Sequence, residues 1–285
     1  MALTRAYEEN EVSPELRRIY ADIRADFDLP FVPTLFKVAA GIPEYLRLMW
    51  DDLEHVAGSR EFHSASKALQ EFAQAQLVTG GWRISDQRRV LAGQRFSSND
   101  VDALGGIVSA FAKALPQMTL FARLMQLGYS GGQPGRVGSA HHPSPIARMI
   151  TFNIPNERDA GLRAWLIYSD IKKTTGCKSV FSFFRALSPF PGYLASVWMD
   201  SKKLLKESGF QRSREELAKR SRALLTGMPV RDHRKHGKNI SSEEWREIEE
   251  TVDGFVRLLP QFTLLVAAWQ RSFPSGAGVG RIRVA

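Results

Sequence analysis

The sequence predicts an all-α protein in which two homologous helical repeats pack together as an intramolecular pseudo-dimer. The stretch from 19 to 52 returns from 167 to 200 at a constant offset of 148. The aligned identities include the pairs Pro43/Pro191, Tyr45/Tyr193, Leu46/Leu194 and Trp50/Trp198. Apolar residues recur at helical spacing, and no stretch alternates apolar and polar residues convincingly. A repeat of about 115 residues exceeds the ~20–50 residues of a solenoid unit, so we expect two halves related by a pseudo-twofold axis.

The repeat continues toward the end of each half. After a loop that is four residues shorter in the second half, the offset becomes 144, and LPQMTL at 115–120 aligns with LPQFTL at 259–264. We therefore predict a first repeat over 1–127, a linker over 128–157, a second repeat over 158–273 and a flexible tail over 274–285. The linker assignment rests on its many Gly and Pro residues and its weak periodicity.

Local signals place the helices of the first half. Ser13, Pro14 and Glu15 supply a capping hydroxyl, a proline at the first helical position and an acid near the positive end of the helix dipole. The further expected segments are a turn over 34–40, helices over 43–55 and 62–78, a weak helix over 83–91 and a helix capped by Ser98. Pro116 is expected to kink or end this last helix, and 117–127 is expected to form one more apolar helix. The second half repeats this order, with Ser241 at the matching helix start.

Composition limits the class of protein. The 285 residues are 44% hydrophobic, enough for a substantial core, and the single Cys177 excludes an internal disulfide and fits a reducing compartment. We read no membrane span of ~18 apolar residues and no signal peptide, so the expected location is cytoplasmic. The net charge of +9 is compatible with three kinds of partner: nucleic acid, an anionic surface or small anionic ligands. No nucleic-acid motif accompanies the basic run at 231–238, which we interpret as a solvated loop.

Familiar catalytic and metal motifs are missing. The glycines of the tail form G-x-G-x-G without a flanking strand and helix. His141 and His142 have no further ligands in view, and Cys177 has no obvious His partner. We therefore predict no metal and no cofactor.

The duplicated segments resemble the group I 2-haloacid dehalogenases, which act on both enantiomers of 2-halo acids. The resemblance covers nearly the whole chain. It rests on Y-x-D-I-R at 20–24, P-F-V at 30–32, P-x-Y-L at 43–46 and Trp50, and in the second half on F-x-A-L at 184–187 and P-x-x-L at 191–194. It implies an all-helical pseudo-dimer with the active site between its halves. It also implies direct attack of water on the carbon–halogen bond, activated by an Asp and helped by an Asn.

The positions of that catalytic pair carry other residues here. The family's Asp precedes the Phe of the F-x-A-L segment, where this chain has Phe183, and the Asn corresponds to Leu115. The aromatic residue after Pro30 is kept as Phe31, whereas Thr34 replaces a family Phe. Since a carboxylate must take the proton of the attacking water, we expect activity or substrate to have diverged.

Candidate site residues follow from the two-half geometry. Polar side chains of the echoed segments are expected to face a shared cleft, where Lys37 and Arg185 would pair with a carboxylate. Asp22 and Asp170 are the candidates for a catalytic carboxylate. The predicted substrate-binding residues are Phe31, Thr34, Lys37, Leu115, Met118, Ser182, Phe183 and Arg185. For Lys37 and Arg185 an ordinary surface charge or helix-cap contact is the competing interpretation.

Two functions remain open from the sequence. One is hydrolysis of a carbon–halogen bond in a small organic acid, with divergent activity. The other is a non-catalytic protein that binds a small acidic or apolar ligand on the same scaffold. The sequence predicts no membrane or nucleic-acid partner and leaves a homodimer open.

Overall fold

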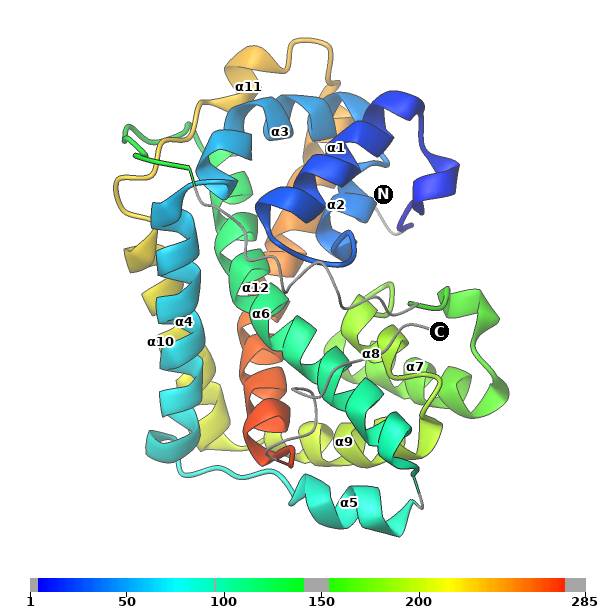
Figure 1. Ribbon diagram of the computed structural model, residues 1–285. Helices are drawn as coiled ribbons and strands as arrows, with labels where there is room; N and C mark the ends of the chain where they lie inside the picture. Colours follow the sequence, from blue (N-terminus) through cyan, green and yellow to red (C-terminus); the bar gives the residue numbers. More distant parts are fainter. Residues whose placement is uncertain (1–4, 95, 141–153, 275–285) are drawn as a thin grey trace.

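The predicted all-α class is confirmed. The computed structural model describes residues 5–94, 96–140 and 154–274, and within those ranges the regular elements are helices without a strand. In Figure 1, α1–α3 lie at the top and α7–α9 at the lower right, with the long helices α6 and α12 between them.

The two halves contain the same elements in the same order. The first half runs η1 (Glu9–Glu11), α1 (Pro14–Asp26), α2 (Thr34–Ala39), α3 (Pro43–Ala57), α4 (Arg60–Thr79), α5 (Gln87–Gly93) and α6 (Ser98–Tyr129). The second half runs η3 (Glu157–Asp159), α7 (Leu162–Thr175), α8 (Ser182–Ala186), α9 (Pro191–Leu204), α10 (Ser208–Leu224), α11 (His233–His236) and α12 (Ser242–Ser272). The expected elements are therefore present, with shifted bounds.

Short-range side-chain contacts fix several helix starts. The Ser13 hydroxyl accepts a hydrogen bond from the Leu16 amide at 3.3 Å, as the sequence predicts. At the start of α6 the cap is Ser97 rather than the expected Ser98, because Ser97 and Asp100 exchange hydrogen bonds as a capping box. Ser241 forms the same capping box at the start of α12.

Of the two outcomes expected at Pro116, a kink or a helix end, the end does not occur. One helix, α6, continues through Pro116 to Tyr129, and α12 likewise contains Pro260. An interior proline costs about 3 kcal/mol of helix stability. Here the residues on both sides of Pro116 are buried, and this packing keeps the helix continuous. Figure 1 shows α6 bending along its length rather than ending, as expected for a helix that has lost one backbone hydrogen bond.

The helices α6 and α12 form the centre of the molecule. Both are long and apolar enough to span a membrane, but 83% and 78% of their most apolar windows are buried inside the fold. They pack against each other more extensively than any other pair of helices described. Their apolar composition is therefore accounted for by the core that they share.

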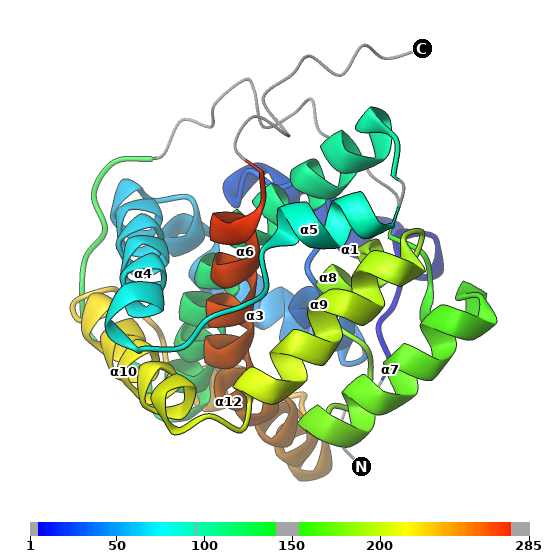
Figure 2. The same cartoon turned by 90° about the horizontal axis from the view of Figure 1, so that it is seen from below.

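Each half contributes elements to the surface of the other. The helix α5 of the first half packs on α9 and α12, and α11 of the second half packs on α3 and α6. Figure 2 shows α5 lying next to α9. In the same reciprocal way, α4 contacts α12 and α10 contacts α6. Each half thus packs against equivalent elements of the other.

Equivalent residues of the two halves also contact each other. The hydroxyls of Thr34 and Ser182, which are 148 residues apart, share a hydrogen bond in the buried interface. The hydroxyls of Thr119 and Thr263 do the same at 2.8 Å across α6 and α12. In a twofold interface only residues near the axis meet their own equivalents.

We expect Thr119 and Thr263 to be energetically coupled. Valine at either position removes the hydrogen bond between the two hydroxyls, but the remaining hydroxyl can still donate to the carbonyl four residues earlier, of Leu115 or Leu259. Each single variant should therefore lower the free energy of unfolding by about 0.5–1.5 kcal/mol. The double variant should cost about 0.5–1.5 kcal/mol less than the sum, because the shared hydrogen bond can be lost only once. Urea denaturation of the four proteins measures this coupling.

Thr79→Val is the matched control for that cycle. The Thr79 hydroxyl donates to the Ala75 carbonyl four residues earlier, as the hydroxyls of Thr119 and Thr263 can do with Leu115 and Leu259. Unlike those two residues, Thr79 is exposed, and its hydroxyl has no partner in the other half among the described residues. Strictly additive costs for Thr119→Val and Thr263→Val would contradict a direct contact between them.

The basic run at 231–238 is mostly exposed, as expected for a solvated segment, but it includes the short helix α11 and a buried residue that contacts the first half. Its His233 is fully buried, and Asp52 of α3 accepts hydrogen bonds from His233 Nε2 at 2.9 Å and Arg231 Nε at 2.6 Å. Gly128 makes room for this arrangement, since a Cβ there would overlap the His233 ring. The run thus attaches the second half to the first. Sequence periodicity cannot reveal a contact between residues 181 positions apart.

Candidate functional site

A small inner cavity lies where the sequence predicts the site. It has a volume of about 20 Å³, about enough for one water molecule, and is lined by residues of both halves. Six of the eight predicted substrate-binding residues line it together: Phe31, Thr34, Leu115, Met118, Ser182 and Phe183. The two halves therefore enclose these six residues together.

Aromatic rings fill the space around Phe183. Its ring centroid lies 4.0 Å from that of Phe184, 5.1 Å from Phe262 and 6.2 Å from Phe111. Phe111 in turn stacks on Phe31 at 4.6 Å. Phe183 is only 2% exposed, so it is a core side chain as well as a cavity wall.

The inner cavity offers hydroxyls but no carboxylate from the described residues. Its polar side chains are Thr34 and Ser182, which bond to each other, and the Ser182 amide also donates to the Thr34 hydroxyl at 3.2 Å. Hydroxyls of ordinary pKa accept a proton from water poorly, whereas a carboxylate near it can act as a general base. A water molecule in this cavity would therefore lack a base among its described neighbours.

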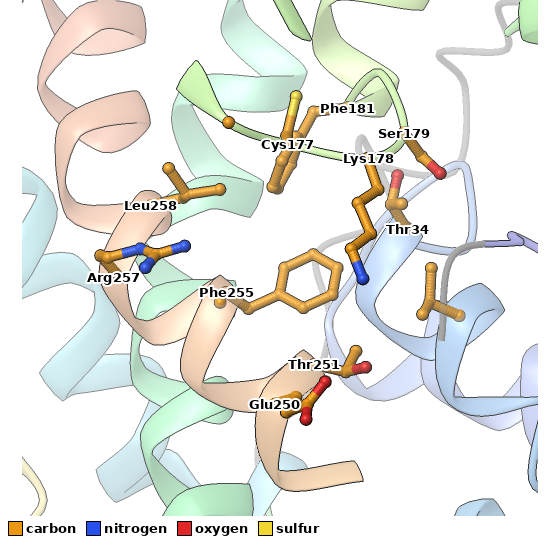
Figure 3. A pocket seen from close by; sticks show the side chains of 13 residues that line it. Thr34, Cys177, Lys178, Ser179, Phe181, Glu250, Thr251, Phe255, Arg257 and Leu258 are labelled. Atoms are coloured by element: carbon orange, nitrogen blue, oxygen red, sulfur yellow. The ribbon is translucent and has the colours of Figure 1, made fainter. Parts of the chain in front are cut away.

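A larger outer cavity adjoins the inner one and shares Thr34, Phe181 and Phe255 with it. Its volume is about 130 Å³, and its walls come from α2, α12 and the loop before α8. Figure 3 shows Lys178 extending down from that loop and Arg257 extending in from α12. The third charged lining residue is Glu250, also on α12.

The outer cavity combines an apolar wall with a charged rim. Phe181, Phe255 and Leu258 are buried, whereas Lys178 and Arg257 are exposed. Two cations at the mouth of an apolar cavity can hold the carboxylate of an organic acid whose apolar part lies against the rings. Sequence reasoning missed these residues, because an exposed Lys or Arg on a helix or loop looks like any other surface charge.

Cys177 also lines the outer cavity. Burial raises the pKa of its thiol, and the Thr175 hydroxyl donates a hydrogen bond to the sulfur at 3.0 Å. A raised pKa leaves little thiolate near neutral pH, so the geometry gives Cys177 no role as a nucleophile.

Lys37 and Arg185 do not line either described cavity. Both are buried, and both face Glu8 of the N-terminal segment: the Lys37 ammonium donates to Glu8 Oε2, and Arg185 Nη1 lies 3.5 Å from Glu8 Oε1. Burial lowers the pKa of Lys37, and the Glu8 carboxylate opposes this shift. The competing interpretation of a surface charge is excluded for both residues.

The two catalytic candidates lie away from both described cavities. Asp22 is on an exposed position of α1. Asp170 accepts hydrogen bonds from Lys202 and from the Trp198 indole at 2.7 Å each, and these bonds lower the pKa of Asp170. Asp170 thus ties α7 to α9.

The possible metal ligands His141 and His142 lie outside the described residues, as do Gly276, Gly278 and Gly280. Within the described ranges, no group of three or more His, Cys, Asp and Glu side chains is close enough to hold a metal ion.

The fold and the cavities define an all-helical, two-halved protein with an aromatic inner cavity and a cationic outer rim. The family model described as Halocarboxylic acid dehydrogenase DehI matches the chain over residues 30–184 and 179–284. These matches span more than half of the chain, and the chain belongs to this family.

Two proteins similar to this chain are (R)-2-haloacid dehalogenases. An (R)-2-haloacid dehalogenase of Pseudomonas putida is 24% identical over 242 residues, covering 80% of this chain and 78% of that protein. A second, from Rhizobium sp. (strain NHG3), is 22% identical over 233 residues, covering 80% and 90%.

Solved structures show the same fold. A D-2-haloacid dehalogenase mutant in complex with D-2-CPA matches with a TM-score of 0.87 and 22% identity, covering 96% of this chain and 97% of that one. A D-2-haloacid dehalogenase in complex with L-LA matches with the same values. At this identity the likeness establishes the shared architecture.

Proposed function

We propose that this protein is a diverged 2-haloacid dehalogenase that takes a larger, more hydrophobic organic acid than short 2-halo acids and hydrolyses short ones only faintly. The observation that carries this proposal is the inner cavity, in which Phe183 and Leu115 occupy the positions expected for the catalytic pair. In direct hydrolysis a water oxygen bonds to the halogen-bearing carbon as halide leaves, and a base takes the proton of the water. The described residues around this cavity supply no such base.

The outer cavity supports an acid as the ligand. Lys178 and Arg257 would hold the carboxylate at the mouth, and the carbon chain would extend along Phe181 and Phe255 toward the inner cavity. The arrangement favours longer acids, because each buried methylene contributes about 0.8 kcal/mol. Glu250, at the same rim, would repel a second negative charge, so a monocarboxylate fits best.

We also propose the enantiomer preference, the relation between the two halves and the location of this protein. The resemblance to group I enzymes supports action on both enantiomers, whereas the names of the relatives specify the (R) or D form, so both enantiomers need to be assayed. The reciprocal contacts between the halves support a pseudo-twofold arrangement. The single cysteine supports a cytoplasmic location, and we propose a reaction that needs no cofactor.

Binding measured by calorimetry tests the acid proposal. Across 2-halo acids of increasing chain length, the Kd is expected to fall about fourfold for each added methylene. Lys178→Gln and Arg257→Gln should each weaken binding about two- to fivefold, since exposed ion pairs contribute about 0.2–1 kcal/mol. Lys238→Gln, which neutralises an exposed lysine away from the cavities, is the control. Tight binding of short halo acids alone would contradict the proposal.

A further inference from the structure

Equivalent positions of the two halves can be compared directly. The comparison includes the segments before α1 and α7. The short helices η1 and η3 occupy equivalent positions at the offset of 148. Glu9 of η1 pairs with Arg24 of α1, and the equivalent Glu157 of η3 pairs with the equivalent Lys172 of α7. These segments therefore fold back onto their halves in the same way.

In the first half this segment neutralises a buried cation. The residue before η1 is Glu8, and its carboxylate accepts a hydrogen bond from the buried Lys37. The preceding carbonyl, of Tyr7, accepts one from the phenol of Tyr20 at 3.0 Å. Both buried donors are thus satisfied by two consecutive residues.

In the second half the carboxylate is missing. Asn156 stands where Glu8 does, and Arg185 stands where Lys37 does. Arg185 is only 4% exposed. Its Nη1 donates to the Pro155 carbonyl at 3.4 Å, but its Nε and Nη2 are buried and have no acceptor among the described residues.

A second unpaired donor lies in the same region. The Tyr168 hydroxyl, equivalent to that of Tyr20, is buried and is not in hydrogen-bonding geometry with any described acceptor. The equivalent Tyr20 bonds to the residue next to Glu8, so Tyr168 has the corresponding place beside Asn156. Burial raises the pKa of Tyr168, and a hydrogen bond from Ser188 and the charge of Arg185 oppose this shift. Buried donors without an acceptor are destabilising, so this region is complementary to an anion.

We propose that Arg185, flanked by Tyr168, binds the carboxylate of a small organic acid at the position that Glu8 occupies in the first half. The Nε and Nη2 edge of a guanidinium presents two parallel N–H donors, which match the two oxygens of a carboxylate. Lys37 and Arg185 carry two positive charges and Glu8 one negative charge, so one bound monocarboxylate neutralises the cluster. None of these residues lines the inner or outer cavity, so this site is separate from both.

Thermal unfolding in sodium acetate tests this site, with sodium chloride at the same ionic strength as the reference. Acetate at about ten times its Kd is expected to raise the Tm by about 3 °C more than chloride does, with saturation. Arg185→Gln should abolish the difference. Because that variant removes a buried charge and could unfold the protein, the decisive substitution is at Asn156.

Asn156→Glu supplies the missing carboxylate from the chain itself. It is expected to raise the Tm without acetate and to reduce the acetate response severalfold, since Glu8 reaches Lys37 from the equivalent position. Asn156→Gln has the same side-chain length without the charge and should keep the wild-type response. Equal acetate responses in these two variants, or no specific response in the wild type, would overturn the proposal. A saturable chloride effect that Asn156→Glu removes would overturn the carboxylate assignment in favour of a halide.

Discussion

Wild-type protein is expected to release chloride from 2-chloropropionate about 10²–10⁴-fold more slowly than a dehalogenase in which a positioned carboxylate activates water, because that is the usual contribution of a general base. The reason is the environment of Phe183 and Leu115, which surround the inner cavity with apolar atoms. The measurement is chloride release from each enantiomer over a broad pH range. The same assay on the Pseudomonas putida relative gives the ratio of the two rates.

The double variant Phe183→Asp with Leu115→Asn should restore part of this activity. The register of α8 directs residue 183 into the inner cavity, so a carboxylate there would lie beside the space for one water. Recovery should increase with pH, because burial among aromatic rings raises the pKa of a carboxyl group and only the ionised form is a base. The double variant should also be less stable than the wild type. Loss of a buried Phe typically lowers the free energy of unfolding by about 3–5 kcal/mol.

Phe183→Asn with Leu115→Asn is the matched control. It makes the same cavity without a titratable group and should remain inactive at every pH. Robust chloride release by the wild type would contradict the proposed divergence. In that case Glu250→Gln, Asp22→Asn and Asp170→Asn would identify the base, starting with Glu250, the carboxylate that lines the outer cavity.

Asp52→Asn is expected to lower the free energy of unfolding by about 1.5–3 kcal/mol at pH 7, the usual contribution of hydrogen bonds to a charged group. The buried His233 loses its partner, whereas the half-exposed Arg231 is solvated in either case. Asp52 is 2% exposed and holds both His233 and Arg231, which connect the two halves. The neighbouring Asp51 is exposed, so Asp51→Asn should change stability by no more than about 0.5 kcal/mol.

The pH dependence provides an independent measurement of the same cluster. Burial alone would raise the pKa of Asp52, but hydrogen bonds from His233 and Arg231 outweigh it and hold the pKa at about 2. A carboxyl pKa that is lower in the folded than in the unfolded state stabilises the protein above about pH 4, and this contribution is lost as the pH falls toward 2. The amount is on the order of 2 kcal/mol, and urea denaturation between pH 2 and 7 should show it in the wild type and in Asp51→Asn but not in Asp52→Asn. Parallel pH profiles for all three proteins would contradict this assignment.

The sequence by itself determined the helical class, the duplicated order of elements and most of the helix starts. These properties depend on interactions within three or four residues, such as the Ser13 cap, and on apolar spacing that the chain carries locally. The family resemblance and the duplication together indicated residues that line the inner cavity, and the equivalent Thr34 and Ser182 meet there.

Only the tertiary structure decided which buried residues face the cavity and which polar groups pair. Every residue of α2 and α8 is buried, so periodicity could not separate Thr34, which lines the inner cavity, from Lys37, which turns to Glu8. The continuous helix through Pro116 depends on packing from all sides. The contact of Asp52 with His233 and the rim of Lys178 and Arg257 bring together residues distant in the chain. Such contacts arise from the relative placement of packed helices, which no local pattern specifies.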